Sequence, residues 1–143
     1  MPMIDIYANE GTFRDRAALA AAAAATVMHV EGVPEIPMFR ENTAAFVHEL
    51  PVGSISDVAG GSAHVRVQVL TNAGALDRDK QIAVVERLTA LVVEMAGDPS
   101  LARRTWVLLT EATPGGWGLW GHAQTNEELV QAARTEIASL QGR

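Results

Sequence analysis

The chain has 143 residues, of which 48% are hydrophobic and 20% charged, and its formal net charge is −6. This profile predicts a globular protein with its own core rather than a disordered segment. The negative charge, without any run of Lys or Arg, argues against nucleic acid or an anionic membrane as a partner. There is no cysteine for disulfide or thiol chemistry, and the first residues carry no secretion signal. We therefore expect a cytoplasmic protein that acts on small molecules or on other proteins.

The first half of the sequence predicts a strand, a helix and a second strand. Residues 3–8, MIDIYA, alternate apolar with more polar side chains, as a half-buried strand does. Thr12, with Asp15 three residues later, has the pattern of a capping box for a helix that runs to about Val30. A loop, GVPEIP, follows the helix, and residues 42–51, NTAAFVHELP, form the second predicted strand.

The second half repeats this order. Residues 64–70, HVRVQVL, place three valines on one face and polar side chains on the other, which is typical of a strand. Asp77 is a good N-cap for a helix that runs to about Ala96, and residues 105–112, TWVLLTEA, form the fourth predicted strand. The apolar stripe predicted on this helix comprises Ile82, Val85, Thr89, Val92 and Ala96, widened by Leu88, Leu91 and Met95.

Landmarks recur after roughly sixty residues, which indicates a duplication. Glycines stand at 11 and 74, prolines at 34 and 99, and strand glutamates at 49 and 111. We expect one domain over residues 1–143, with a pseudo-repeat of 2–61 and 63–122. The predicted fold class is α+β, with two fused β-α-β units that form a four-stranded mixed sheet with two helices on one face.

A helical tail over residues 125–143 completes the prediction. It begins with a capping box of Thr125 and Glu128. An apolar stripe for docking follows, formed by Val130, Ala133, Ile137 and Leu140. Because a sheet covered on one face leaves much Val and Ile open to water, we also expect the chain to associate with itself.

Pro2 is a candidate catalytic residue, because removal of Met1 would make it a secondary amine at the N-terminus. An α-amino group titrates near pH ~8 in water, so desolvation or a nearby cation can bring it to neutrality. Such an amine takes up and returns protons at the pH of the cell. The alternative is that Pro2 has no role, as in many proteins that begin Met-Pro.

Several motifs together resemble the tautomerase superfamily. They are Pro2 at the start of a strand, EG at its end, a helix, and a strand that runs into a Gly-rich hairpin. The segment TEATPGGWGLWG (110–121) resembles the hairpin of 4-oxalocrotonate tautomerase, and PMIDIYANEG resembles that family's first strand. The double-length chain is similar to cis-3-chloroacrylic acid dehalogenase and malonate semialdehyde decarboxylase. The resemblance covers roughly residues 2–122.

This resemblance implies a homotrimer whose sheets enclose a central barrel. Pro2 would lie at the end of its strand in an apolar pocket and act as general base and then as general acid. The substrate would be a small keto or enol acid, and the chemistry needs no metal and no organic cofactor.

Two further residues match positions of the family. His29 falls where dehalogenase-like members place a helix histidine that donates a hydrogen bond to the substrate. Its alternative role is to interact with the carbonyls at the helix C-terminus. Trp117 matches an aromatic residue that walls the pocket, and its alternative role is packing at a subunit interface. His48 is expected to be a hydrogen-bonded strand histidine rather than a base.

The carboxylate-binding arginines of the family are absent. The two dehalogenase arginines fall on Asn72 and Ala75, and its water-activating glutamate falls near Leu119. We therefore reject dehalogenation as the activity. Arg14 and Arg40 are candidates to replace the arginine pair, with Asn72 as a neutral donor, although both arginines also fit a role as solvated surface charges.

The sequence thus predicts a tautomerase for a small 2-oxo acid or its enol. A mono-acid with an apolar group, such as a phenylpyruvate-type enol, fits a Trp-lined pocket. One alternative is a decarboxylase or hydratase of a 3-oxo or unsaturated acid on the same fold, with Arg40 as the polarising cation beside Pro2. The other is a non-catalytic trimer, which retention of Met1 would favour.

Overall fold

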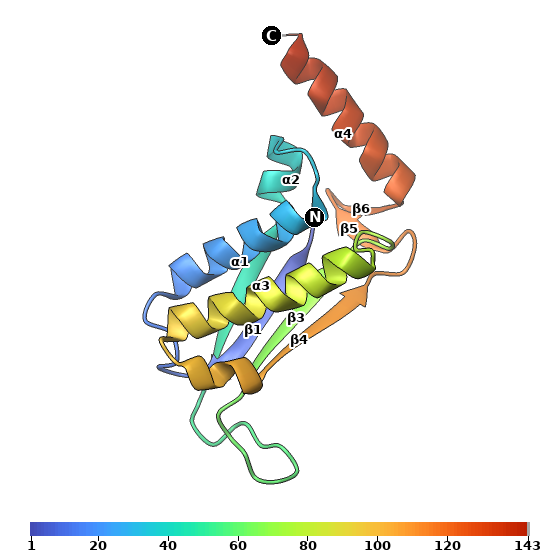
Figure 1. Cartoon of the computed structure of the whole chain (residues 1–143). Coiled ribbons are helices and arrows are strands. Elements are labelled where there is room, and N and C mark those ends of the chain that lie inside the picture. The colour runs from blue at the N-terminus through green and yellow to red at the C-terminus, as the bar shows by residue number, and fades with distance from the viewer. Residues whose placement is uncertain (143) are drawn as a thin grey trace.

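The computed structural model describes residues 1–142 and contains a four-stranded sheet with the strand order β2-β1-β3-β4. β1 and β2 are parallel, β3 and β4 are parallel, and β1 and β3 are antiparallel at the centre. Two β-α-β units therefore lie side by side in one mixed sheet, which confirms the predicted fold class (Figure 1). The strands are β1 (Met3–Asn9), β2 (Ala44–Leu50), β3 (Val65–Thr71) and β4 (Thr105–Glu111).

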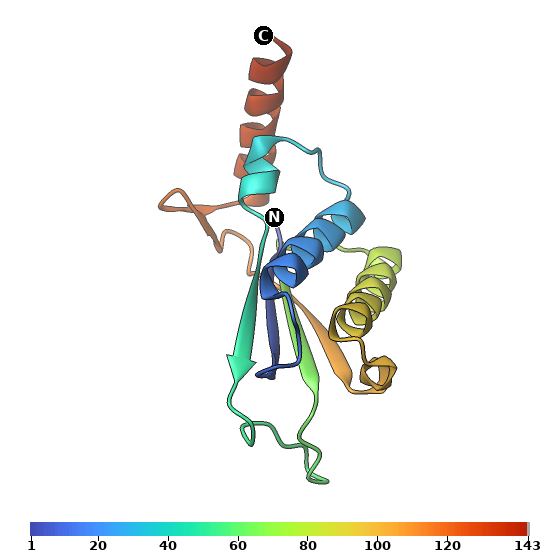
Figure 2. The ribbon, with the colours of Figure 1, turned by 90° about the vertical axis from the view of Figure 1, so that its left-hand side faces the viewer.

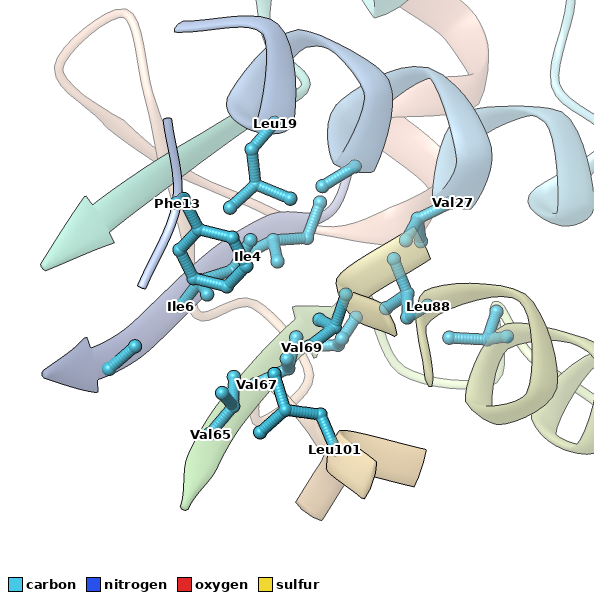
Figure 3. Close-up of a cluster of buried hydrophobic side chains, with 14 of the residues drawn as sticks. Ile4, Ile6, Phe13, Leu19, Val27, Val65, Val67, Val69, Leu88 and Leu101 are labelled. Carbon is cyan, nitrogen blue, oxygen red and sulfur yellow. The ribbon is translucent and has the colours of Figure 1, made fainter. Parts of the chain in front are cut away.

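Helices α1 (Arg16–Glu31) and α3 (Arg78–Ala96) cover one face of this sheet, as the view turned by 90° shows (Figure 2). The valines of β3 point toward them and are almost fully buried, while the intervening Arg66 is exposed. Figure 3 shows the core that results between the sheet and the helices. Its labelled side chains are Ile4, Ile6, Phe13, Leu19, Val27, Val65, Val67, Val69, Leu88 and Leu101.

The buried stripe of α3 differs from the predicted one. Val84, Leu88 and Val92 are buried, whereas Ile82 and Val85 are exposed. The three buried positions are four residues apart and form one ridge along the helix. The apolar residues of α3 extend more than halfway around it, so the sequence pattern did not reveal which part of that arc faces the core.

The start of α1 also differs from prediction. Its N-cap is Asp15, whose side chain accepts a hydrogen bond from the Ala18 N–H at 2.9 Å. Thr12 instead donates its hydroxyl to the Asn9 carbonyl and remains in the preceding turn. Asp15 is the better cap because it lies directly before the first helical residue. In α3 the predicted cap is correct, since Asp77 accepts from the Lys80 N–H.

The remaining elements lie at the ends of the sheet. A short helix that the sequence did not predict, α2, precedes β2, and a 3₁₀ helix, η1, precedes β4. The Gly-rich hairpin is present as β5 and β6, which pair antiparallel. The bounds are α2 (Pro37–Glu41), η1 (Pro99–Arg103), β5 (Trp117–Leu119), β6 (His122–Gln124) and α4 (Asn126–Gln141).

Helix α4 begins with the predicted capping box of Thr125 and Glu128 and extends past the end of the sheet (Figure 1). Its predicted stripe is correct only in part. Of its positions, Ala133 is buried and Ile137 partly buried, but Val130 is 49% and Leu140 38% exposed. Leu129, which was not in the predicted stripe, is also buried. Within the described part of the chain, α4 packs through one narrow face only, so apolar positions at the sides of that face remain open.

The sheet face opposite α1 and α3 is uncovered in the single chain (Figure 2). Strand alternation places three large apolar side chains there, Phe46, Trp106 and Leu108, each about half exposed. His48 also lies on this face and is hydrogen bonded to Asp5 at 2.7 Å, as expected for a strand histidine with a partner.

No helix within residues 1–142 combines the length and apolarity needed to cross a bilayer.

Candidate active site at the start of β1

Pro2 directly precedes β1, and both Pro2 and Met1 are buried. The Pro2 carbonyl accepts a hydrogen bond from the Ala44 N–H, so this residue is fixed against β2. The Met1 side chain is 1% exposed and belongs to an apolar cluster that is separate from the main core. The other buried members of this cluster are Ile36, Met38, Trp117, Leu129 and Ala133. The residue whose removal would free the Pro2 amine therefore fills an apolar pocket.

Met1 also lines a groove of about 480 Å³. The groove lies between the end of α1, the loop after β3 and the side of α4. Gly32 ends α1 in the left-handed conformation and turns the chain along one wall of the groove. The lining is mostly apolar and includes Phe39, Leu129 and Ile137. Such a lining suits a small ligand with an apolar group.

Two polar side chains in this lining have atoms without a partner. The Asn72 Nδ2 and the Glu31 Oε2 are both buried, and neither makes a hydrogen bond. The other carboxylate oxygen of Glu31 is 3.0 Å from the Met1 amine, and the two side chains are 6% and 1% exposed. A buried donor or acceptor without a partner costs about 1–3 kcal/mol. Two residues of the groove lining thus hold a donor and an acceptor that the fold does not use.

Cationic side chains approach the groove from two helices. Arg134 lines it from α4, and the Lys80 Nζ of α3 donates to the Glu31 carbonyl at 2.8 Å. Among residues 1–142, no three His, Asp or Glu side chains lie together in the way that a metal ion requires.

Glu31 and Arg134 were not predicted from the sequence. Glu31 nevertheless has a signal in the sequence, because it is an acidic residue in the last turn of the first helix. The helix dipole disfavours negative charge at that end. Arg134 has no comparable signal, because one arginine on a helix usually belongs to its solvated face.

The predicted site residues fall into three places. Asn72 lines the groove beside Met1, and Trp117 packs in the apolar cluster around Met1, so both lie near Pro2. His29 and Arg40 line a neighbouring hollow of about 440 Å³, which meets the groove at residues 32 and 33. Both are exposed, and Arg40 is 3.8 Å from Glu35.

Arg14 lies at the opposite end of the molecule. It is exposed and follows the end of β1, while Pro2 stands at its beginning. A strand of seven residues spans about 20 Å. Arg14 is therefore not brought together with the other predicted site residues in the single chain.

No family model matches the sequence, and no curated protein matches it. Several solved structures are similar over most of the chain, among them the following three. A native fused 4-OT has a TM-score of 0.71 at 19% identity and covers 90% of this chain and 98% of its own. N1, a member of the cis-3-chloroacrylic acid dehalogenase family, has a TM-score of 0.70 at 17% identity and covers 96% of this chain and 99% of its own. Pt0534 inactivated by 2-oxo-3-pentynoate has a TM-score of 0.70 at 20% identity and covers 84% of this chain and 93% of its own.

The molecule is an α+β protein of two β-α-β units with a proline directly before its first strand. It shares its fold with these three structures, which is the fold that the resemblance of the sequence implied.

Proposed function

We propose that this protein is a tautomerase whose proton carrier is the amine of Pro2 after removal of Met1. The substrate is a small 2-oxo acid, or its enol, with one carboxylate and an apolar or aryl group. One observation carries the proposal. Met1 fills an apolar pocket beside the groove that contains the unpartnered Asn72 Nδ2. Loss of Met1 would leave a free amine at the base of a cavity with a hydrogen-bond donor in its wall.

The proposed chemistry moves one proton and no other group. The amine takes a proton from the carbon next to the carbonyl, and the C–H electron pair becomes part of the enol double bond. The protonated amine then supplies, directly or through a neighbouring group, the proton that the carbonyl oxygen gains. The Trp117 ring and its apolar neighbours keep water away from the amine. Desolvation alone favours the neutral amine, which acts as the base, whereas a carboxylate next to the amine would favour the protonated form, which acts as the acid in the ketonisation direction.

Substrate binding rests on a neutral donor and one cation. The Asn72 Nδ2 would donate to a carboxylate or carbonyl oxygen, and Arg134 would attract the carboxylate from the α4 side of the groove. A pair of arginines that grips a carboxylate in two places is stronger and more specific than this set. We therefore propose a preference for mono-acids over dicarboxylates.

We also propose that the chain works as a homotrimer in the cytoplasm. The uncovered sheet face, with Phe46, Trp106 and Leu108 exposed, favours burial against further copies of the chain. The absence of cysteine is compatible with a reducing compartment.

The experiment compares wild type with Pro2→Ala on phenylenolpyruvate and on 2-hydroxymuconate, after intact mass has confirmed that Met1 is absent. Ketonisation is followed by absorbance. The variant should lose about a hundredfold or more in rate, because it lacks the ring amine that carries the proton. Undiminished turnover by Pro2→Ala would contradict the proposal.

Covalent labelling provides a second measurement in the same experiment. The reagent 2-oxo-3-pentynoate, with which Pt0534 was inactivated, carries an alkyne that reacts with a nucleophilic amine. We expect one adduct on the N-terminal peptide of the wild type and none at that position in Pro2→Ala. Labelling elsewhere on the wild-type chain, with activity lost, would point to a different catalytic group.

A non-catalytic protein is the second candidate, and one observation favours it. Met1 is almost fully buried, and its amine is ion-paired with Glu31, so the unprocessed chain has a well-packed N-terminus. Retention of Met1 in the purified protein would support this candidate. Decarboxylation or hydration has less support, because Arg40 lies near Glu35 in the neighbouring hollow rather than beside Met1.

A further inference from the structure

Glu31 is a buried carboxylate whose position the stability of α1 does not explain. It occupies the last turn of α1, where a negative charge opposes the helix dipole. Its side chain is 6% exposed, and burial of a carboxylate is costly unless the charge is paired. The partner that the structure gives it is the N-terminal amine of Met1, at 3.0 Å from Oε1. Its second oxygen, Oε2, is buried without a partner, and Glu31 is one of the residues that line the groove.

Removal of Met1 would take away this partner and leave the Pro2 amine close to Glu31. The nitrogens of Met1 and Pro2 are joined through one Cα and one carbonyl carbon, so they are at most about 4 Å apart. With Met1 N 3.0 Å from Oε1, the Pro2 nitrogen lies within about 7 Å of Oε1 before anything moves. Loss of the methionine also vacates space beside Glu31, and we expect a change of the Glu31 rotamer to bring its carboxylate to the Pro2 amine.

We infer, on the basis of the proposed function, that Glu31 is the carboxylate partner of the mature Pro2 ammonium and the second member of its proton-transfer pair. In the enol-to-keto direction, a Pro2 N–H proton forms the new C–H bond. The enol O–H proton passes to Glu31 Oε2 as the C=O bond forms. The proton on Glu31 then returns to the Pro2 nitrogen along the hydrogen bond between them, so both groups regain their starting charge.

Other charged groups around the N-terminus do not offer an equivalent carboxylate. From α3, Lys80 contacts the backbone of Glu31, and from α4, Arg134 lines the groove. Both are cations and oppose the protonated amine. Glu136 of α4 is occupied by the Met38 N–H at 3.0 Å, and on α2 Arg40 faces the neighbouring hollow toward Glu35. The contact of Glu31 with the N-terminal amine is direct, so it should outweigh the two cations.

Titration of the Pro2 amine tests the pairing without any substrate. The processed chain is labelled with ¹³C and ¹⁵N proline, and the ring signals of Pro2 are followed by NMR against pH. In the wild type we expect a pKa above ~8, the ordinary value of an α-amino group, because a carboxylate in direct contact stabilises the cation by more than desolvation of the amine destabilises it. Glu31→Gln should lower this pKa by about one unit or more. The control is Glu86→Gln, which removes the same charge from an exposed position on α3 and should leave the wild-type value.

Kinetics test the proton-transfer role. Glu31→Gln should lower kcat for ketonisation by about a hundredfold while KM stays near the wild-type value, because the lost group moves a proton. The alkaline limb of its pH–rate profile should move to lower pH. Glu31→Asp, which keeps the charge on a shorter side chain, should recover part of the rate.

The outcomes separate this inference from the proposed function. A Pro2 titration that is the same in wild type and Glu31→Gln overturns the pairing. Should Glu31→Gln fail to fold, the wild type decides alone, since a Pro2 pKa at or below the ordinary value overturns the pairing. A Glu31-dependent titration with no turnover of either enol supports the pairing and contradicts the tautomerase function.

Discussion

Asn72 illustrates, at the scale of one residue, how a side chain can weaken the fold and still be useful. Its Nδ2 is buried without a hydrogen-bond partner, which costs folding free energy. Elsewhere in the described chain such amides are used by the fold, as where Asn42 donates to the Met38 carbonyl and Asn126 to the Ala73 carbonyl. The fold leaves the Asn72 Nδ2 unpaired, which favours a role for it in binding a ligand in the groove.

Substitution of Asn72 by Ala should therefore separate stability from binding. We expect the free energy of unfolding to stay the same or to rise slightly, because an unpaired buried donor is removed. KM for the enol acid should rise about tenfold or more, since a hydrogen bond to a charged group contributes roughly 1.5 kcal/mol or more. Steady-state kinetics and denaturant unfolding measure the two effects.

The matched control is Asn9→Ala at the other end of β1. Asn9 has a buried Oδ1 without a partner but donates its Nδ2 to the Ser62 carbonyl, so this variant loses a hydrogen bond that Asn72→Ala does not and should be the less stable of the two, with KM unchanged. If Asn72→Ala loses stability and leaves KM unchanged, the amide serves the fold and the groove lacks the proposed donor.

At the scale of the element, the carboxylate of Glu128 joins the hairpin to the start of α4, because it contacts both His122 and the Thr125 N–H. The Thr125 N–H beside Glu128, at 3.0 Å, holds the pKa of that carboxyl below its ordinary value of 4.5, and His122 acts in the same direction. A carboxyl with a lowered folded-state pKa contributes stability that is present above the unfolded value and is lost as the pH falls through the folded value.

Glu128→Gln should consequently lower stability at neutral pH but not in acid. Glutamine keeps the capping geometry without the charge, so the difference from wild type isolates the charge of Glu128. Urea unfolding at a fixed protein concentration, at about pH 7 and at about pH 3, measures that difference. Because the site is exposed, we expect the neutral-pH loss to be small. An equal difference at both pH values would mean that packing or hydrogen bonding, rather than charge, carries the effect.

Regular elements were predictable because a period in the sequence determines them. Alternation in residues 64–70 marks β3, and the capping box at Thr125 marks the start of α4. Helix α2 was missed because five residues are too few to show a helical period. The rotation of α3 depends on contacts with α1 and the sheet, which no local pattern contains.

The site was less predictable than the fold for a related reason. Pro2, Asn72 and Trp117 were selected by their register with a family pattern, and the structure places Asn72 and Trp117 near Pro2. Glu31 was missed because its partner is the N-terminal amine, 30 positions away in the chain. Only the fold brings the end of α1 and the start of β1 together.

At the scale of the whole molecule, helices cover only one face of the sheet in the single chain. One face packs on two helices and holds the main core, and the other bears exposed aromatic and aliphatic side chains on its outer strands. Exposed apolar patches of this kind mark interaction surfaces. The proposed trimer would bury this face of each chain against its neighbours.

Leu108→Arg should prevent that assembly. Leu108 is 45% exposed on the open face of β4, and burial of an unpaired guanidinium at a subunit contact is strongly unfavourable. Light scattering on a sizing column should give three times the mass of one chain for wild type and the mass of one chain for the variant.

Ile82→Arg is the matched control, because Ile82 is 42% exposed but lies on α3, on the opposite side of the sheet. It should remain trimeric. If wild type itself is monomeric, or if both variants dissociate alike, the open face of the sheet is not the surface through which the chain assembles.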